Sequence, residues 1–293
     1  MKLQTPVSFA PSRIPVTPDD RVLAIGSCFA DQIGGRLLHA GFDACVNPFG
    51  TLYNPLSLAG ALSRLCDGHP FTTSECVEMG AGAGLVCSFS HHTSFARETP
   101  EEFLAHANDA LEDAAAFWRD CNKVLVTLGT IFCWLHGGAV IANCLKRPAA
   151  EFERVEMTLE QVTAVLRSIV ISSPGKEFIF TVSPIRHLSD GAHLNQLSKS
   201  TLLLAVDALM RDPVVGQRCE YFPAYEIVLD ELRDYRFYAE DMTHPTAQAA
   251  DYIWERFLDF AVLPDDRPRI AAAEKEWRAA QHRPLHGNPT ESR

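Results

Sequence analysis

The chain has 293 residues, 47% hydrophobic and 22% charged, which is the composition of an ordinary globular protein and excludes a disordered or fibrous one. Its formal net charge is −11, from 26 basic and 37 acidic residues, and this balance argues against nucleic acid as a partner. No stretch approaches the roughly 18 uninterrupted apolar residues of a membrane span, and the first residues lack the apolar segment of a secretory signal. We therefore expect no membrane span and a cytoplasmic location.

The cysteines favour the same compartment. There are nine of them, an odd number, and Cys45, Cys87, Cys121 and Cys133 lie inside apolar runs and not at the regular spacing of a disulfide scaffold. A reducing cytoplasm fits this usage. The sequence contains neither a CxxC pair nor HExxH, so we expect no metal site. Nothing in the sequence indicates an oligomeric state.

The first half of the chain begins with a short branched apolar run, residues 21–25, that ends in Gly26. Apolar residues at helical spacing follow it, so a strand, a tight turn and a helix are predicted here. Residues 55–66 are typical of a short helix, and residues 75–90 of a hairpin or an irregular insertion. Residues 99–102 form a capping box with proline at the first helical position, which predicts a helix to about residue 120.

The second half alternates in the same way. A second capping box, residues 158–161, predicts a helix to about residue 171. The other predicted elements are strands at 123–128, 177–182 and 218–222 and helices at 196–211 and 246–260. Strands that alternate with helices form a mostly parallel sheet, and ligands bind beyond the carboxyl ends of its strands. We expect one domain over residues 1–262 and a charged, peripheral C-terminal tail over residues 263–293, frayed at its end.

Two polar motifs follow the first and last predicted strands. Ser27 and Cys28 stand at the entrance of a helix, whose N-terminus stabilises an anion and lowers a thiol pKa; the alternative is a serine N-cap beside a buried cysteine. Asp241 and His244 are three residues apart, so the carboxylate can orient the imidazole as a base. Here the alternative is that Thr243 or Asp241 caps the helix that begins near Pro245.

The two motifs together resemble a known family. Residues 26–30, GSCFA, match the motif that names the GSCFA family, which is placed among the SGNH (GDSL-type) hydrolases. The resemblance covers roughly residues 5–262. Its further motifs are Asn47-Pro48-Phe49-Gly50, Tyr53-Asn54-Pro55, Leu128-Gly129-Thr130, Ala142-Asn143-Cys144 with Lys146, Val182 to His187 with Asp190-Gly191, Asn195, Ser198-Lys199, Tyr221-Phe222-Pro223 and Asp241-x-x-His244-Pro245. The resemblance implies a flavodoxin-like three-layer α/β/α fold of the SGNH-hydrolase type.

The resemblance also implies a catalytic group. In the superfamily a serine of a Gly-Asp-Ser motif attacks an acyl carbonyl, and an Asp-x-x-His motif supplies the base; here Asp241 and His244 match that second motif. Laid over Gly-Asp-Ser, the first motif puts Cys28 at the nucleophile position, and a shift by one residue puts Ser27 there instead. A thiolate supported by His244 is competent for acyl transfer.

The oxyanion donors are less directly matched. Gly50 resembles the glycine of the superfamily's second block, whereas the Gly-x-Asn-Asp block is represented only by Leu128-Gly129-Thr130. The Thr130 hydroxyl, or an amide from Asn54 or Asn143, is therefore expected to supply the missing donor.

Other polar residues follow the strand at 177–182. Arg186 is a candidate for binding a phosphate or carboxylate, with a loop salt bridge to Asp190 as the alternative, and His187 is a second candidate base. Lys199 is expected on a solvated helix face. Residues 221–225 and the tryptophans Trp118, Trp134 and Trp254 are expected in the core.

Three functions fit these residues. The first is a hydrolase of a small ester, such as an acetyl group on a carbohydrate, that needs no cofactor. The second is an acyltransferase that uses coenzyme A, with Arg186, Lys146 or Lys199 near its phosphates; a capsule-polysaccharide acetyltransferase family with a Gly-Asn-Cys motif is similar. The third is a binding module that kept the fold without the chemistry, which the altered first and third blocks favour and the intact Asp-x-x-His motif disfavours.

Overall fold

A computed structural model describes residues 4–281 of the chain. Its centre is a five-stranded sheet in which all neighbouring strands are parallel. The strand order is β2 (Asp43–Val46), β1 (Arg21–Gly26), β5 (Lys123–Leu128), β9 (Glu177–Val182) and β10 (Cys219–Tyr221). This is the order of flavodoxin-like folds, in which the strand order reverses direction beside the first strand. The predicted α/β class with a mostly parallel sheet is confirmed.

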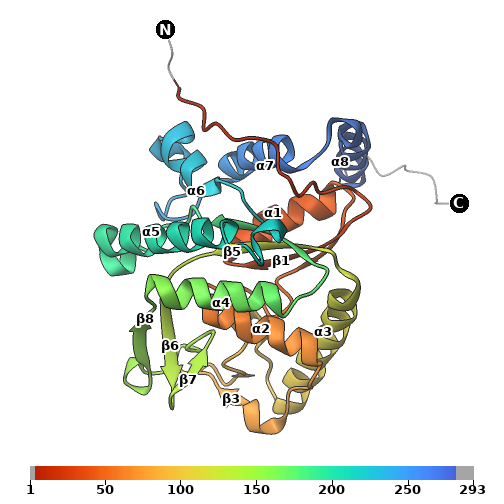
Figure 1. Cartoon of the computed structure of the whole chain (residues 1–293). Helices are drawn as coiled ribbons and strands as arrows, with labels where there is room; N and C mark the ends of the chain where they lie inside the picture. The colour runs from red at the N-terminus through yellow and green to blue at the C-terminus, as the bar shows by residue number, and fades with distance from the viewer. Residues whose placement is uncertain (1–3, 282–293) are drawn as a thin grey trace, which may run out of the picture.

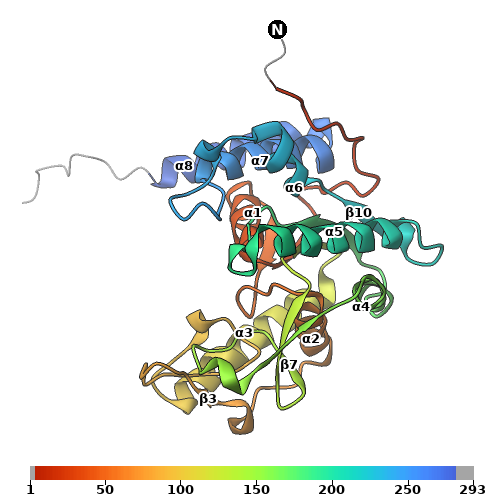
Figure 2. The ribbon, with the colours of Figure 1, turned by 90° about the vertical axis from the view of Figure 1, so that its left-hand side faces the viewer.

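Helices cover both faces of this sheet, so the domain has three layers (Figure 1, Figure 2). Because both faces are covered, the central strands are buried throughout; Leu23 and Ile25 of β1 pack into one core, and Val22 and Ala24 into the other. On the first face lie α2 (Pro55–Asp67), α3 (Pro100–Asp120), α4 (Leu159–Ile171) and α5 (Gly191–Met210). On the second lie α1 (Cys28–His39), α6 (Ala224–Glu226) with the π-helical segment Ile227–Leu232, α7 (Ala247–Ala261) and α8 (Arg267–Gln281).

Helix boundaries follow the capping residues. Thr99 accepts a hydrogen bond from the Glu102 amide, and Thr158 and Gln161 form the complete capping box at the start of α4. These local signals explain why the predicted bounds of α3 and α4 agree with the structure. The helix α5 differs, since it begins at Gly191 and not at residue 196.

Two small antiparallel sheets complete the fold. β3 (Val77–Glu78) pairs with β4 (Val86–Cys87), which confirms a hairpin within residues 75–90. β6 (Phe132–His136) pairs with β7 (Ala139–Ile141) and with β8 (Glu153–Glu156), below the central sheet in Figure 1. The sequence did not indicate this three-stranded sheet, because its strands are short and β7 and β8 are largely exposed.

The C-terminal helix α8 lies in the region expected to be a peripheral tail. Ile270 is buried, the Trp254 indole donates a hydrogen bond to Glu274 (2.9 Å), and Trp277 stacks on His39 with ring centroids 3.5 Å apart. Residues 267–281 therefore pack on the domain as a helix. The expected frayed end lies beyond residue 281, outside the described residues.

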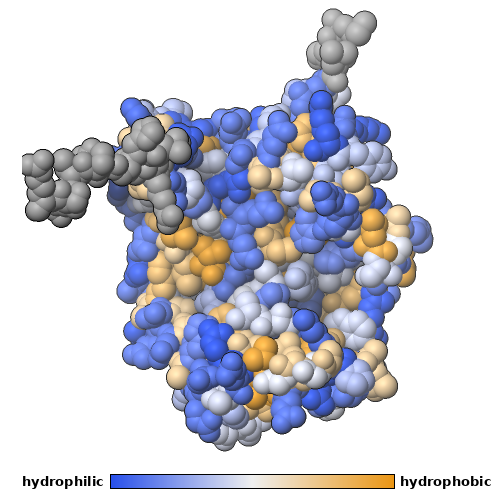
Figure 3. Space-filling view, turned by 180° about the vertical axis from the view of Figure 1, so that it is seen from behind, coloured by the Kyte–Doolittle hydropathy of each residue, from blue (hydrophilic) through white to orange (hydrophobic). Residues whose placement is uncertain are grey.

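The molecular surface is mixed in character. Seen from behind, apolar residues form separate patches among hydrophilic ones (Figure 3), as on an ordinary globular protein. Within residues 4–281, no helix has both the length and the apolar character needed to cross a bilayer.

Candidate functional site

The turn after β1 is fixed by its neighbours. Gly26 has φ +139°, and a Cβ atom there would lie 2.1 Å from the carbonyl oxygen of Thr127, so only glycine fits. Its N–H donates to Asn47 Oδ1 (2.8 Å), and the Ser27 N–H donates to the Thr127 carbonyl (3.1 Å). The turn is thus tied to both neighbouring strands, and the start of α1 at Cys28 is held in a defined position.

Ser27 and Cys28 have different surroundings. Ser27 is 1% exposed, and its hydroxyl accepts a hydrogen bond from the Phe29 N–H (3.4 Å) as the N-cap of α1. The Cys28 side chain is half-buried, and its sulfur lies 3.5 Å from Nε2 of His244. Of the two candidate nucleophiles, Cys28 is therefore the one that contacts the candidate base.

His244 is oriented by Asp241. Asp241 Oδ2 lies 2.5 Å from His244 Nδ1, and Oδ1 accepts the backbone N–H groups of Thr243 and His244, each at 2.9 Å. These bonds hold the pKa of Asp241 well below its usual range, so the carboxylate is charged. When Nδ1–H donates to this carboxylate, Nε2 is left as an acceptor facing Cys28. Neither Asp241 nor Thr243 caps α7; Thr246 does.

The Cys28 thiol is not strongly acidic at rest. Burial raises its pKa, and the backbone N–H groups at the start of α1 and the charge of Lys199 only partly oppose this effect. The sulfur therefore stays protonated near neutral pH and needs a base to become a nucleophile. His244 is positioned to be that base.

These residues stand at one end of a cleft of about 320 Å³ beyond the carboxyl ends of β1, β5 and β9. This is the edge of the sheet where such folds bind ligands. Its lining comes from the strand ends, from β6 and β8 of the small sheet, and from the loop before α7. The lining residues are Cys28, Tyr53, Asn54, Thr130, Phe132, Trp134, Ala142, Arg154, Ile185, Arg186, His187, Ser189, Asp190, Thr243 and His244.

Hydrogen-bond donors for an oxyanion lie near Cys28. Asn54 lines the cleft and is also the N-cap of α2, where its side-chain oxygen accepts a hydrogen bond from the Ser57 N–H (2.9 Å). Because the oxygen faces the helix, the amide nitrogen of the same side chain is turned away from it. The backbone N–H of Cys28 stands at the first turn of α1, where helical N–H groups lack intrahelical partners. The Tyr53 hydroxyl is close enough to Cys28 for a charge on the sulfur to raise the phenol pKa, although burial is the larger cause.

Three other predicted donors are occupied or distant. The Gly50 N–H donates to the Asn47 carbonyl (2.7 Å), and Gly50 does not line the cleft. Thr130 lines the cleft, but its N–H donates to the Tyr53 carbonyl (2.9 Å), and its hydroxyl accepts the Phe132 N–H (3.2 Å) and shares a hydrogen bond with the Ser198 hydroxyl of α5 (3.1 Å). The Asn143 side-chain oxygen accepts an N–H two residues further on (2.8 Å), outside the cleft. These residues shape the loops around the site.

Arg186 lies at the mouth of the cleft. Its guanidinium donates to the Met242 carbonyl (3.1 Å) and lies 5.4 Å from the ring centre of Tyr238. The alternative role for Arg186, a loop salt bridge to Asp190, is wrong, because Asp190 pairs with Arg154 of β8 at 2.5 Å. Among residues 4–281 no carboxylate forms an ion pair with Arg186, which leaves this cation free to bind an anionic group.

His187 lines the cleft as a neutral side chain. Burial, together with the charges of Lys199 and His244, lowers its pKa to about 4. Its Nε2 is buried and has no hydrogen-bond partner among the described residues. Such a weakly basic imidazole is a poor general base and a better candidate for a hydrogen bond to substrate.

Two residues that the sequence assigned elsewhere belong to this region. Trp134 lines the cleft and is not in the core, whereas Trp118 and Trp254 are buried as expected. Lys199 is fully buried and not on a solvated face. A signal existed for Lys199, because it stands at i+4 of the buried stripe of α5, whose i, i+3 and i+7 positions are Asn195, Ser198 and Leu202.

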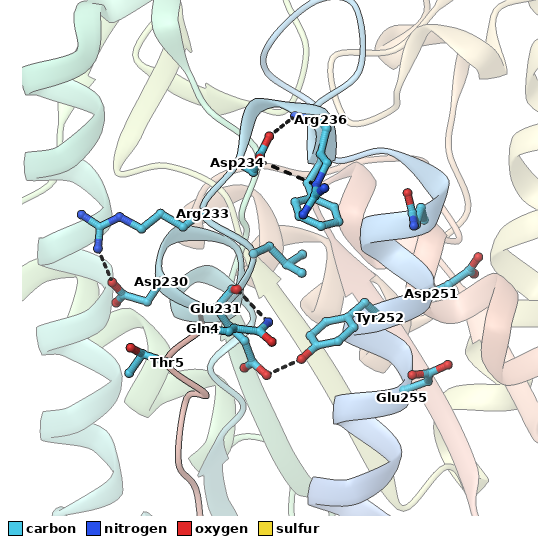
Figure 4. A pocket seen from close by; sticks show the side chains of 13 residues that line it. Gln4, Thr5, Asp230, Glu231, Arg233, Asp234, Arg236, Asp251, Tyr252 and Glu255 are labelled. Carbon is cyan, nitrogen blue, oxygen red and sulfur yellow. Dashed lines mark hydrogen bonds and ion pairs between the residues drawn. The ribbon is translucent and has the colours of Figure 1, made fainter. Parts of the chain in front are cut away.

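A separate, larger hollow of about 1090 Å³ lies between the π-helical segment, the N-terminal segment and α7 (Figure 4). Its polar groups bond to one another; Gln4 donates to the Glu231 carbonyl (2.9 Å), and the Tyr252 hydroxyl donates to the Glu231 carboxylate. Its lining contains no cysteine or histidine. These bonds attach the N-terminal segment to the domain, and the hollow offers no nucleophile. Across residues 4–281, no three His, Cys, Asp or Glu side chains are grouped so as to hold a metal ion.

Comparison with known proteins identifies one family. The model of the GSCFA family matches residues 21–257, which include the turn after β1 and the Asp241-to-His244 loop. No curated protein and no solved structure gives a significant match to the chain.

Proposed function

The chain belongs to the GSCFA family, and from this premise we propose that it is an SGNH-like enzyme that cleaves a small ester, such as an acetylated carbohydrate, through an acyl intermediate on Cys28. One observation carries the proposal: Cys28, His244 and Asp241 form a connected row at the end of a cleft, with 3.5 Å between Sγ and Nε2 and 2.5 Å between Nδ1 and Oδ2. Nucleophile, base and orienting carboxylate in this order are the parts of a catalytic triad.

The reaction follows from these contacts. Nε2 of His244 takes the proton of the Cys28 thiol while the sulfur attacks the ester carbonyl, so a C–S bond forms and the carbonyl oxygen becomes an anion. Collapse of this intermediate breaks the C–O bond, and the protonated His244 gives its proton to the leaving alcohol. A water molecule, deprotonated by His244, then attacks the thioester and releases the acid and the free thiol.

The oxyanion needs donors aimed at it. The Cys28 N–H and the Asn54 amide are the two best placed, and the Tyr53 hydroxyl is a third. Asp241 keeps its charge throughout and stabilises the imidazolium that forms on His244. Since all nine cysteines are unpaired, the enzyme fits a reducing compartment, and we place it in the cytoplasm.

A second candidate is acyl transfer from a thioester carrier such as coenzyme A, in which an alcohol replaces water in the last step. The observation that favours it is the guanidinium of Arg186, which has no carboxylate partner among residues 4–281 and also lines an adjoining groove of about 270 Å³. Tyr235 and Tyr238 line the same groove, together with Arg233, which pairs with Asp230, and the acidic Asp234. A free cation beside two aromatic rings suits an anionic aromatic carrier.

The decisive experiment is intact-protein mass spectrometry after exposure to p-nitrophenyl acetate and, separately, to acetyl-coenzyme A. Wild type is compared with Cys28→Ala, Ser27→Ala and, as the matched control, Cys144→Ala, whose half-buried thiol lies outside the cleft. We expect one acetyl group on the wild type and on the Ser27 and Cys144 variants, and none on Cys28→Ala.

Each other outcome has a definite meaning. An adduct lost only in Ser27→Ala transfers the nucleophile to the serine. An adduct from acetyl-coenzyme A but not from the simple ester favours transfer over hydrolysis. An adduct on no protein, together with no turnover of either reagent, contradicts the enzyme and favours a binding module built on the same fold.

A further inference from the structure

Lys199 of α5 lies beneath the candidate site, and its side chain is fully buried. Its Nζ donates hydrogen bonds to the carbonyl oxygens of Gly129 (2.7 Å) and Ser183 (2.8 Å). These two residues directly follow β5 and β9, the strands whose carboxyl ends border the cleft. The lysine therefore connects the two strand ends from below.

The charge of this lysine has no carboxylate partner among residues 4–281, because both of its hydrogen bonds go to backbone carbonyls. Burying a cation without a counter-ion is costly, and two carbonyl oxygens and the ring of Tyr225, 5.9 Å away, offset only part of that cost. Burial lowers the pKa of Lys199 to about 7. A methionine would fill the same volume without this cost, so the retained lysine suggests a use for its charge.

Two groups of the site, Cys28 and His187, lie within the electrostatic reach of this charge. On α1, it opposes the rise in the Cys28 pKa that burial causes. In the loop after β9, it helps to lower the pKa of His187. On α6, Tyr225 faces it through its ring. The other neighbours that act on the Cys28 sulfur are Asp31 of the same helix, which raises its pKa, and His244, which lies against it.

We propose that Lys199 is a positioning residue that supplies a buried positive charge, stabilises the anion on Cys28 during attack, and adds to the effect of burial that keeps His187 neutral for contact with substrate. The proposal rests on the proposed function in taking Cys28 as the reacting group. It does not require ester turnover, because the charge acts on the thiol before any substrate is present.

A purely structural role makes a different prediction. If Lys199 only clamps the ends of β5 and β9, then removing it loosens the domain and changes the rate of every reaction of Cys28 by the same factor at all pH values. If its charge matters, the effect follows the titration of Lys199 and disappears once the lysine is neutral. The pH dependence therefore distinguishes the two roles.

The test is the rate at which iodoacetamide alkylates Cys28, followed by mass spectrometry of the peptide that contains it, between pH 6 and pH 9. Iodoacetamide reacts with the thiolate, so the rate reports how much thiolate is present. The variants are Lys199→Met and Lys199→Arg. The matched control is Lys176→Met, because Lys176 is also buried and also donates hydrogen bonds to two carbonyls, those of Trp118 (2.6 Å) and Cys121 (2.7 Å). Lys176 precedes β9 and therefore lies at the opposite end of the sheet from the candidate site.

We expect wild type to react about tenfold faster than Lys199→Met at pH 6, where the lysine is charged, and at nearly the same rate at pH 9, where it is neutral. Lys176→Met should match wild type throughout. In Lys199→Met the imidazole of His187, followed by NMR, should also titrate at a higher pH than in wild type.

Lys199→Arg keeps the result decisive if the methionine variant does not fold. A guanidinium stays charged at pH 9, so this variant should match wild type at pH 6 and exceed it several-fold at pH 9. A ratio of rates that stays constant from pH 6 to pH 9 in the variant that folds, with His187 unchanged, overturns the proposal and leaves Lys199 as a clamp. Loss of esterase activity alone would instead bear on the proposed function.

Discussion

The buried histidine His91 should make the domain sensitive to acid. Its side chain is 0% exposed, its Nδ1 bonds to the Ser88 hydroxyl (2.7 Å), and its Nε2 has no partner among the described residues. The surrounding rings are those of Phe49, Phe71, Phe95 and Phe103. Burial, with help from the charges of Arg64 and His106, lowers the pKa of His91 from 6.5 to about 3.

The direction of the effect follows from linkage. The folded pKa is below the unfolded one, so the unfolded chain binds the proton first; stability is complete above pH 6.5 and falls as the pH drops from there toward 3. At pH 5 an ordinary imidazole is protonated by a ratio of about 30 to 1, while the native His91 stays neutral, and RT ln 30 is about 2 kcal/mol. We therefore expect His91 to cost the fold about 2 kcal/mol between pH 7.5 and pH 5.

The assay is urea denaturation at pH 7.5, 6 and 5 for wild type, His91→Asn and the control His69→Asn. Asparagine places an amide near the position of Nδ1, so the bond to Ser88 can persist without a titrating group. His69 is exposed, and its replacement should leave the pH dependence unchanged.

The quantity to compare is the loss of unfolding free energy from pH 7.5 to pH 5, not its absolute value, because the shorter side chain leaves a cavity that costs the same at each pH. His91→Asn should lose about 2 kcal/mol less than wild type over this interval. Equal losses in the two proteins would refute the reasoning. They would mean that His91 is protonated in the native state or that water reaches its Nε2.

Two further predictions concern the site. Gly26→Ala should destabilise the domain by at least about 2 kcal/mol, because its Cβ would lie 2.1 Å from the Thr127 carbonyl at φ +139°. The control Gly35→Ala, whose Cβ would have no atom within 4 Å, should be neutral or stabilising. Thermal unfolding of both variants checks this, and equal melting temperatures contradict it. Asp241→Asn should slow turnover of p-nitrophenyl acetate roughly 100-fold without loss of fold, because His244 loses the carboxylate partner of its Nδ1. Steady-state kinetics measure this effect, and an unchanged kcat/KM removes Asp241 from the mechanism.

Much of the fold could be predicted because its signals are local. The strands at 123–128 and 177–182 are predominantly apolar, since helices cover both faces of the sheet. Thr99 and Thr158 mark helix starts through contacts within one turn. Residues that follow strands of a parallel sheet gather at one edge, so Cys28 and His187 could be expected near each other. The pairing of Cys28 with His244 was predicted from a family motif, not from local chemistry.

The rest depended on contacts between distant parts of the chain. Asp190 has an arginine four residues away in Arg186, which made a local ion pair the alternative interpretation, yet Asp190 pairs with Arg154 of β8. Trp134 lines the cleft because β6 pairs with β7 and β8, whose sequences are too short and too polar to predict a sheet.

What the sequence by itself determined is the type and order of most elements and the identity of the nucleophile, base and orienting carboxylate as candidates. Only the tertiary structure decided which polar groups are free. The Gly50 N–H bonds within its own loop, and the Thr130 hydroxyl bonds to Phe132 and to Ser198 of α5. The Asn54 amide is turned away from α2 by its capping bond, and Lys199 lies beneath the strand ends. A hydrogen bond depends on direction and distance in space, and residue type alone fixes neither.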